Sequence, residues 1–300
     1  MGGRGIDMSA SVLRRRFAQI VGGLVAGAFL FCGASSVALA GPPVTSGLVL
    51  DLETTAGITM SGSVVTGWAD QSGSGHNASA SGTGSPTLAA HVFNGNSGLV
   101  FNGSTNVMTL AGQQLTSQQY TIFTVGFTNG TGTGYSEQLS NWSSSNMLTS
   151  VFIGDINTGT NYGMRFTDYL GGGAMSQSGV GDGAIVPHAT SILAGVSGAS
   201  SAQAYINGSL VYNDTSAIPT RNLGGTWFVG DQGSLNGEYW NGDIGAILVY
   251  NQALSTSQIT QVQSYLASTY VPEETTPMLL TGLSALALCG LGTRRKKSPQ

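Results

Sequence analysis

Short runs of β-branched and aromatic residues, separated by clusters of Gly, Asn and Ser, recur from residue 47 to residue 251. Such runs are typical of β-strands, and such clusters are typical of the turns between them. Long helical periodicity is absent until the end of this region. The pattern therefore favours an antiparallel all-β fold. The runs that we predict as strands are 47–52, 63–69, 98–103, 120–128, 191–198, 226–231 and 244–251.

An Asn-Gly pair, Asn207 and Gly208, separates two short strand-like runs in AQAYINGSLVYN. Both central residues of a type I′ turn need a positive φ, which Asn and Gly adopt more readily than other residues. This stretch is therefore predicted to form a two-stranded β-hairpin.

One helix is predicted, in NQALSTSQITQVQSYLASTY. Ser255 is a suitable N-cap, and Gln258 stands three residues later to complete a capping box. Leu254 can pack against Ile259 as a hydrophobic staple, and apolar residues then recur on one face. We expect a single amphipathic helix of about fifteen residues that packs on the end of the β-sandwich.

The region 41–270 is long for an average domain but ordinary for a large β-sandwich. Many short strands, glycine-rich turns and one terminal helix predict an all-β fold, a two-sheet antiparallel jelly-roll sandwich with one C-terminal amphipathic helix. A barrel is the structural alternative. The expected organisation is a signal peptide over 1–40, the sandwich over 41–270 and a sorting tail over 271–300.

The charge of the body is strongly negative. Residues 41–271 contain no lysine, eleven acidic residues and only two basic ones, Arg165 and Arg221, which gives a formal charge of −9 with histidine neutral. Nucleic-acid binding rests on a basic patch that releases counterions from the phosphate backbone. Nucleic acid is therefore excluded as a partner.

The N-terminus has the composition of a secretory signal peptide. Basic residues are followed by an apolar stretch and then by Ala38-Leu39-Ala40, which has the small-x-small form of a signal-peptidase site. We expect signal peptidase to release a mature chain that begins at Gly41. Both cysteines, Cys32 and Cys289, lie in terminal apolar runs, so the body has neither a disulfide framework nor a thiolate metal site.

A second apolar run, residues 278–291, precedes four basic residues, 294–297. Fourteen helical residues span about 21 Å, which is short for a stable bilayer span. The basic cluster should stay on the cytoplasmic side, so the body is expected on the far side, with the membrane contacted through this tail at least transiently.

Four blocks of the sequence occur in a familiar order. They are W-x-D-x-S-G-x-G-x-x-A from Trp68 to Ala78, F-x-G at 101–103, the Asn-Gly hairpin, and a closing G-D-I…Y-N-x-A-L-S segment. Together they resemble laminin G-like, concanavalin A-like jelly-roll domains of secreted bacterial proteins over nearly all of 46–270. One departure is the run Ser104, Thr105 and Asn106, which stands where family members often have aspartates.

The tail is similar to the PEP-CTERM sorting signal, in which a Pro-Glu motif precedes an apolar run and a basic cluster. The matching residues are Val271, Pro272 and Glu273, and Glu274 stands where the family usually has a second proline. The resemblance implies an exosortase-like transpeptidase as the partner that processes the chain near this motif. The alternative is an uncleaved C-terminal anchor.

Catalytic motifs are sparse. Asp51 and Glu53 lie two apart on a predicted strand, so both carboxylates project from one face, within reach of a shared proton, water or cation. The spacing resembles a glycosidase E-x-D-x-x-E strand only superficially, and strand-end hydrogen bonding is favoured over catalysis. No G-x-S-x-G elbow is present, and the three histidines have no ligand spacing. We therefore expect no catalytic residues and no enzymatic activity.

Carbohydrate binding and calcium binding are physically reasonable for this body. Sugars are held by aromatic faces and by polar side chains that bond to hydroxyls, and aromatic residues stand in polar loops at Trp142, Tyr239 and Trp240. Burial in the core is the alternative for each tryptophan. Calcium prefers oxygen ligands, and the candidates beside glycine turns are Asn106, Asp155, Asp231 and Asp243.

These observations predict an exported cell-surface or extracellular-matrix protein. Its lectin-like domain would bind an extracellular polysaccharide or act as an adhesive module. The alternatives are a purely structural envelope protein without glycan recognition, and a weak polysaccharide hydrolase or lyase that uses Asp51 and Glu53.

Overall fold

The computed structural model describes residues 41–130, 134–145, 149–159, 161–166, 180–215, 220–233 and 237–272. Within these ranges the chain forms seventeen strands, one short 3-10 helix (Gly82–Gly84) and one α-helix. Every ladder between named strands is antiparallel. The predicted all-β fold with one helix at its C-terminal end is therefore confirmed.

The first sheet is built around β17, the longest described strand. β8 lies along one side of β17, whereas β6 pairs with its first residues and β1 with its last on the other side. The strands are, in spatial order, β5 (Thr87–Phe93), β6 (Asn96–Asn102) beside β1 (Leu48–Glu53), β17 (Asn241–Tyr250), β8 (Tyr120–Thr128), β13 (Ser191–Ser197), β14 (Ala202–Ile206) and β15 (Ser209–Asp214).

The second sheet faces the first and joins it through the single pair Val64 and Thr87, so all strands share one hydrogen-bonded network. Its strands are, in spatial order, β2 (Ile58–Ser61), β3 (Val64–Trp68), β4 (Ala78–Ser79), β7 (Met108–Leu110), β16 (Trp227–Val229), β9 (Gly134–Ser140), β10 (Phe152–Asn157), β11 (Tyr162–Phe166) and β12 (Val180–Ile185).

The main core lies between the two sheets. Alternate residues of a strand point to opposite faces, so Leu50 and Leu52 of β1 point inward while Asp51 and Glu53 point outward. Leu50 and Leu52 belong to one apolar cluster with Trp68 of the second sheet, and all three are fully buried. A shared core of this kind defines a sandwich.

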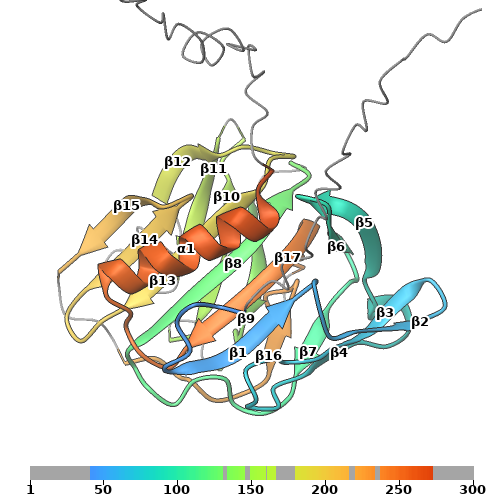
Figure 1. Ribbon diagram of the computed structural model, residues 1–300, viewed down its shortest axis with the longest axis horizontal. Coiled ribbons are helices and arrows are strands. Elements are labelled where there is room, and N and C mark those ends of the chain that lie inside the picture. Colours follow the sequence, from blue (N-terminus) through green and yellow to red (C-terminus); the bar gives the residue numbers. More distant parts are fainter. Residues whose placement is uncertain are drawn as a thin grey trace, which may run out of the picture. The chain divides into compact units, whose positions relative to one another are not determined.

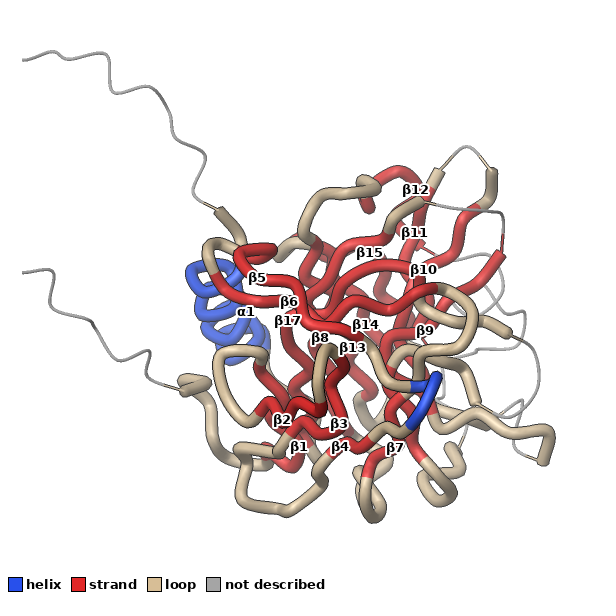
Figure 2. Tube along the Cα trace, turned by 90° about the vertical axis from the view of Figure 1, so that its right-hand side faces the viewer, coloured by secondary structure: helices blue, strands red, loops and turns tan. Residues whose placement is uncertain are grey.

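The helix α1 (Thr256–Tyr270) lies across the outer face of the first sheet (Figure 1). Ser255 caps it, and the capping box with Gln258 is present as predicted. Its buried Val262 and Leu266 form a second apolar cluster with Phe123 of β8 and other outward residues of the sheet. Figure 2 shows α1 on one side, β17 and β8 next to it, and β9 and β10 further away. The expected position at the end of the sandwich is wrong, because the outer face of the first sheet is itself apolar.

Candidate functional site

A polar pocket of about 170 Å³ lies where five strands of the two sheets begin or end. The last residue of β8 and the first of β17 face the ends of β9, β10 and β11. We call it the tyrosine pocket, and it is lined by Gly103, Thr128, Gly134, Tyr135, Ser136, Asp155, Asn157, Tyr162, Gly237, Tyr239 and Asn241.

The strand register brings the polar residues of this pocket together. Asp155 of β10 stands opposite Ser136 of β9, and Asn157 of β10 stands opposite Tyr162 of β11. Cross-strand neighbours of this kind have Cβ atoms only about 5 Å apart. The Asn157 Nδ2 atom donates a 2.7 Å hydrogen bond to the Tyr162 hydroxyl, so the pairing also fixes this side chain.

Three tyrosines give the pocket an aromatic character. Tyr135 is 38% exposed, and Tyr162 and Tyr239 are half-buried. A tyrosine combines an apolar ring face with a polar hydroxyl, which suits contact with the C–H faces and hydroxyls of a sugar ring. Amide and carboxyl groups on the same wall can bond to further hydroxyls.

A buried ion cluster supports the pocket. The Arg165 Nη1 atom forms an ion pair with Oε1 of Glu137 and a second one, 3.0 Å long, with Oε2 of Glu238. The guanidinium carbon lies 3.9 Å from the centre of the Tyr135 ring and 4.6 Å from that of Phe152. These distances are within the range of cation–π contacts, so Arg165 holds the Tyr135 ring in place.

Asp155 is the acidic residue that lines the pocket itself. Burial raises the pKa of its carboxyl group to about 6, although the hydroxyls of Ser136 and Thr128 and the charge of Arg165 oppose the rise. Ser136 Oγ donates a hydrogen bond to Oδ1 of Asp155. Burial also raises the pKa of Glu137 well above its usual range, against the effect of Arg165. Asp155 is therefore an anion at neutral pH that takes up a proton in mildly acidic solution.

The pocket includes one of the three aromatic residues predicted to contact sugar. Tyr239 lines it, whereas Trp142 is only 8% exposed and Trp240 is 2% exposed within the main core. The alternative of burial thus holds for both tryptophans. Both tryptophans have polar neighbours in the sequence. The segment that contains Trp142 is held against the fold by a β-bridge between Trp142 and Gly233.

The four predicted calcium ligands lie in separate places. Asp155 is in the tyrosine pocket, Asp231 follows β16, and Asp243 pairs with Phe127 within the first sheet. The Asn106 side chain bonds to the backbone of its own loop and of Ser85. Among the described residues, no three His, Cys, Asp or Glu side chains are grouped closely enough to hold a metal ion. Calcium binding stays a prediction.

The carboxylate pair of β1 faces α1. Asp51 is 5% exposed and Glu53 is 4% exposed. The two oxygens of Glu53 accept hydrogen bonds from the hydroxyls of Tyr265, at 2.7 Å, and Tyr270, at 2.9 Å. Burial, with the nearby charges of Glu53 and Asp70, raises the pKa of Asp51 to about 7. The predicted shared face is confirmed, and its contacts attach the helix to the sheet.

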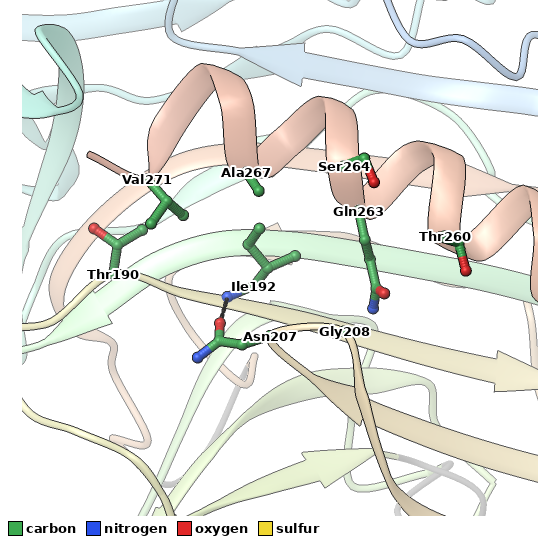
Figure 3. Close-up of a pocket in the computed structure, with 9 residues that line it drawn as sticks. All are labelled: Thr190, Ile192, Asn207, Gly208, Thr260, Gln263, Ser264, Ala267 and Val271. Carbon is green, nitrogen blue, oxygen red and sulfur yellow. Dashed lines mark hydrogen bonds between the residues drawn. The ribbon is translucent and has the colours of Figure 1, made fainter. Parts of the chain in front are cut away.

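A groove of about 460 Å³ runs between α1 and the turn of the β14–β15 hairpin (Figure 3). Asn207 Oδ1 accepts a 2.8 Å hydrogen bond from the backbone N–H of Ile192 at its floor. Its described lining contains neither an aromatic nor an ionisable side chain: Thr190, Ile192, Asn207, Gly208, Thr260, Gln263, Ser264, Ala267 and Val271. The tyrosine pocket is therefore the better match to a sugar.

The predicted processing sites lie at or beyond the edges of the described chain. Val271 is the C-cap of α1 and Pro272 is exposed, whereas Ala38, Ala40 and Glu273 lie outside the described residues. The apolar run 278–291 also lies outside them. In the part of the chain that the structure describes, no helix combines the length and the apolar character needed to cross a membrane.

Several residues of the site were not predicted from the sequence: Tyr135, Asn157, Tyr162, Arg165 and Glu137. One signal was available, because Arg165 is one of only two basic residues in a body with eleven acidic ones. A lone arginine in such a body has many potential carboxylate partners. Tyr135 and Tyr162 gave no comparable signal, since both lie in short strands.

No protein-family model matches this sequence, and no curated protein matches it. Solved structures do match its fold. Domain 4 of AbnA, a GH43 extracellular arabinanase from Geobacillus stearothermophilus in complex with arabinotriose, is 16% identical, with a TM-score of 0.50 over 73% of this chain and 98% of that chain. The sialidase of Trypanosoma rangeli in complex with sialic acid is 17% identical, with a TM-score of 0.52 over 76% of this chain and 34% of that one.

The chain thus has an all-β fold that also occurs in carbohydrate-active proteins, and it spans about a third of the sialidase. The finer laminin G-like and PEP-CTERM resemblances have no matching family model and stay predictions. The expectation of no enzymatic activity is overturned, because this fold occurs within an arabinanase and a sialidase. The lack of a catalytic motif was insufficient ground for it.

Proposed function

We propose that this protein is an exported carbohydrate-binding protein and that the tyrosine pocket is its binding site. The observation that carries the proposal is the convergence of three tyrosines with Asp155, Asn157 and Asn241 in one polar pocket. Aromatic faces combined with a few placed hydrogen-bonding groups are the chemistry by which proteins hold sugars.

The arabinanase domain supports this proposal. The structural match covers 98% of the arabinanase domain at a TM-score of 0.50, and the structure of that domain contains arabinotriose. The likeness concerns the fold, so the sugar itself is proposed from the pocket. The placement of Asp51 and Glu53 beneath α1 gives no support to a hydrolase that would use them, since Glu53 is already bonded to two tyrosines.

The test compares sugar binding by the wild-type chain and by two tyrosine variants, with calorimetry on arabinotriose and a panel of neutral oligosaccharides. Tyr239→Ala should weaken binding at least about fivefold, because one aromatic contact is worth about 1 kcal/mol beyond its buried area. The matched control is Tyr212→Ala, a half-buried tyrosine of β15 outside the pocket. Equal binding by all three proteins, or no binding to any sugar, would reject the proposal. Chromatography of the mixtures would show whether any sugar is cleaved.

We also propose that signal peptidase and an exosortase-like transpeptidase process the two ends, which delivers the body to the cell surface or the extracellular matrix. The small-x-small site at 38–40 and the motif at 271–273 support this. Intact-mass measurement of the protein from its native host is the test. A mature chain that starts at Gly41 and ends before residue 278 is expected, and a chain that still ends at Gln300 excludes processing of the tail.

A further inference from the structure

Acidic groups outnumber basic groups around the tyrosine pocket. Asp155 lines it, and the ion cluster behind Tyr135 contains Glu137 and Glu238 against the single cation Arg165. If the buried Glu137 carboxyl is counted as neutral, the two carboxylates of Asp155 and Glu238 still outnumber the one guanidinium of Arg165. The net charge of this group of side chains is therefore negative at neutral pH. The formal charge of −9 over 41–271 has the same sign.

Arg165 is poorly placed to receive a carboxylated sugar. Its side chain is 6% exposed, it pairs with Glu137 and Glu238, and its guanidinium lies against the rings of Tyr135 and Phe152. A ligand carboxylate would have to displace one of these partners and leave a buried glutamate without its cation, which is costly. The described residues that line the pocket include neither a lysine nor an arginine.

The pocket instead offers acceptors. One buried carboxyl oxygen of the lining, Oδ2 of Asp155, has no hydrogen-bond partner among the described residues. Carboxylates accept hydrogen bonds, and a buried acceptor that lacks a donor is unfavourable. A ligand rich in hydroxyl donors suits such a wall, whereas a ligand carboxylate brings further acceptors and a second negative charge.

We propose that the tyrosine pocket selects neutral saccharides against carboxylated ones, such as uronic or sialic acids, and that Asp155 is the specificity-determining residue. This inference rests on the proposed function. Two like charges about 5 Å apart near a protein surface repel each other strongly enough for a discrimination of about tenfold or more.

The discrimination depends on pH through Asp155. The charged and titratable groups around this carboxyl are Arg165 of β11, Glu137 of β9, Tyr162 of β11 and, beyond Arg165, Glu238. Because burial raises the pKa of Asp155 to about 6, its charge is present at pH 7.5 and largely lost at pH 5.0. A uronate remains ionised at both values, so its repulsion by Asp155 should weaken in acid.

The experiment measures the Kd of the full-length protein for arabinotriose and for trigalacturonate at pH 7.5 and pH 5.0. We expect trigalacturonate to bind at least about tenfold more weakly at pH 7.5, and the ratio of the two Kd values to fall at pH 5.0. Asp155→Asn should bring the ratio toward one at pH 7.5. The matched control is Asp243→Asn, because burial also raises the pKa of this carboxyl to about 6, but it lies outside the pocket. This control should keep the wild-type ratio.

The outcomes separate the two proposals. Similar binding of both sugars by the wild-type protein at pH 7.5 overturns the selectivity and leaves the binding function intact. Loss of selectivity in Asp243→Asn as well as Asp155→Asn overturns the role of Asp155. Failure of both sugars and of the wider neutral panel rejects the proposed function. If Asp155→Asn does not fold, the ratio in the wild-type protein still decides, since a ratio that is unchanged between pH 7.5 and pH 5.0 excludes Asp155 as its cause.

Discussion

The hydroxyl of Tyr270, the last residue of α1, donates a 2.9 Å hydrogen bond to Oε2 of Glu53, the last residue of β1. The two residues are 217 positions apart, so this contact joins the end of the described body to its first strand. Tyr265 bonds to the other oxygen of the same carboxyl group. A buried carboxylate with two hydroxyl donors is thus a polar contact within a largely apolar interface between the helix and the sheet.

Tyr270→Phe is expected to lower the free energy of unfolding by about 1–3 kcal/mol, because it leaves a buried carboxylate oxygen without its donor. Urea denaturation followed by far-UV circular dichroism measures the change. Tyr205→Phe is the matched control, since its hydroxyl bonds to Gln203 in a partly exposed position. A loss in the control as large as that in Tyr270→Phe would contradict the special role of Glu53.

The stability of the protein is expected to fall as the pH rises from about 4 to about 7. Burial, with the charges of Glu53 and Asp70, raises the pKa of Asp51 from 3.8 to about 7, so between these values the folded state holds a proton that the unfolded state has released. Linkage then lowers the free energy of unfolding by up to about 1.4 kcal/mol for each pH unit. The decrease ends once the pH exceeds the pKa of Asp51 in the folded state. Asp155 and Asp243 act in the same direction.

The urea midpoint measured from pH 4 to pH 8.5 tests this pH dependence. Asp51→Asn should flatten the curve, because no proton is then released on unfolding at this site. It should also raise stability at pH 8, because it removes a buried negative charge beside Glu53 and Asp70. Asp182→Asn, an exposed position on β12, should leave the curve unchanged. A wild-type midpoint that rises between pH 4 and pH 7 would show that another group dominates.

The strands that the sequence predicts well are those with continuous apolar runs. β8 has the predicted bounds, 120–128, and its residues are buried almost throughout. β9 and β12 were not predicted, because GYSEQLS and VGDGAI contain too few β-branched or aromatic residues to be distinguished from loops. These two form strands because a neighbouring strand supplies their hydrogen bonds, and that information is not local.

The site could be predicted only in part for the same reason. Tyr239 and Asp155 were both candidates, but for different ligands. Only the pairing of β10 with β9 and β11, together with the bridge between Tyr239 and Glu137, places them in one pocket. Trp142 and Trp240 are aromatic residues in polar segments of the sequence. Composition cannot show to which side of such a segment the ring points, and in both cases the ring is buried.

Asn207 should be replaceable by glycine at a lower cost than by alanine. Its φ is 50° and that of Gly208 is 82°, as the predicted type I′ turn requires, and its Oδ1 accepts a hydrogen bond from Ile192 N–H. Asn207→Gly keeps the backbone conformation and loses the hydrogen bond, for about 1 kcal/mol. Asn207→Ala loses the hydrogen bond and adds about 1 kcal/mol of left-handed strain. Thermal or urea unfolding of both variants gives the comparison, and equal losses would exclude a contribution from the turn.

Arg165 is expected to be the costliest of these positions to replace. It is 5% exposed and pairs with Glu137, which is fully buried, so Arg165→Met removes the cation that compensates a buried carboxyl group. Breaking a buried ion pair from one side typically costs about 3–5 kcal/mol. Urea unfolding measures this loss, and the raised pKa of Glu137 predicts that the loss is smaller at pH 5 than at pH 8, because the carboxyl group can then be neutral.

A double-mutant cycle separates the ion pair from simple packing. Glu137→Gln removes the buried charge, so the variant with both changes should be more stable than Arg165→Met alone by at least about 1 kcal/mol, although it carries one more substitution. Losses that add within about 0.5 kcal/mol would show that the two side chains act independently. In that case Arg165 would stabilise the site through its contacts with the rings of Tyr135 and Phe152, and Arg165→Lys, which keeps the charge without the planar group, should then be nearly as damaging as Arg165→Met.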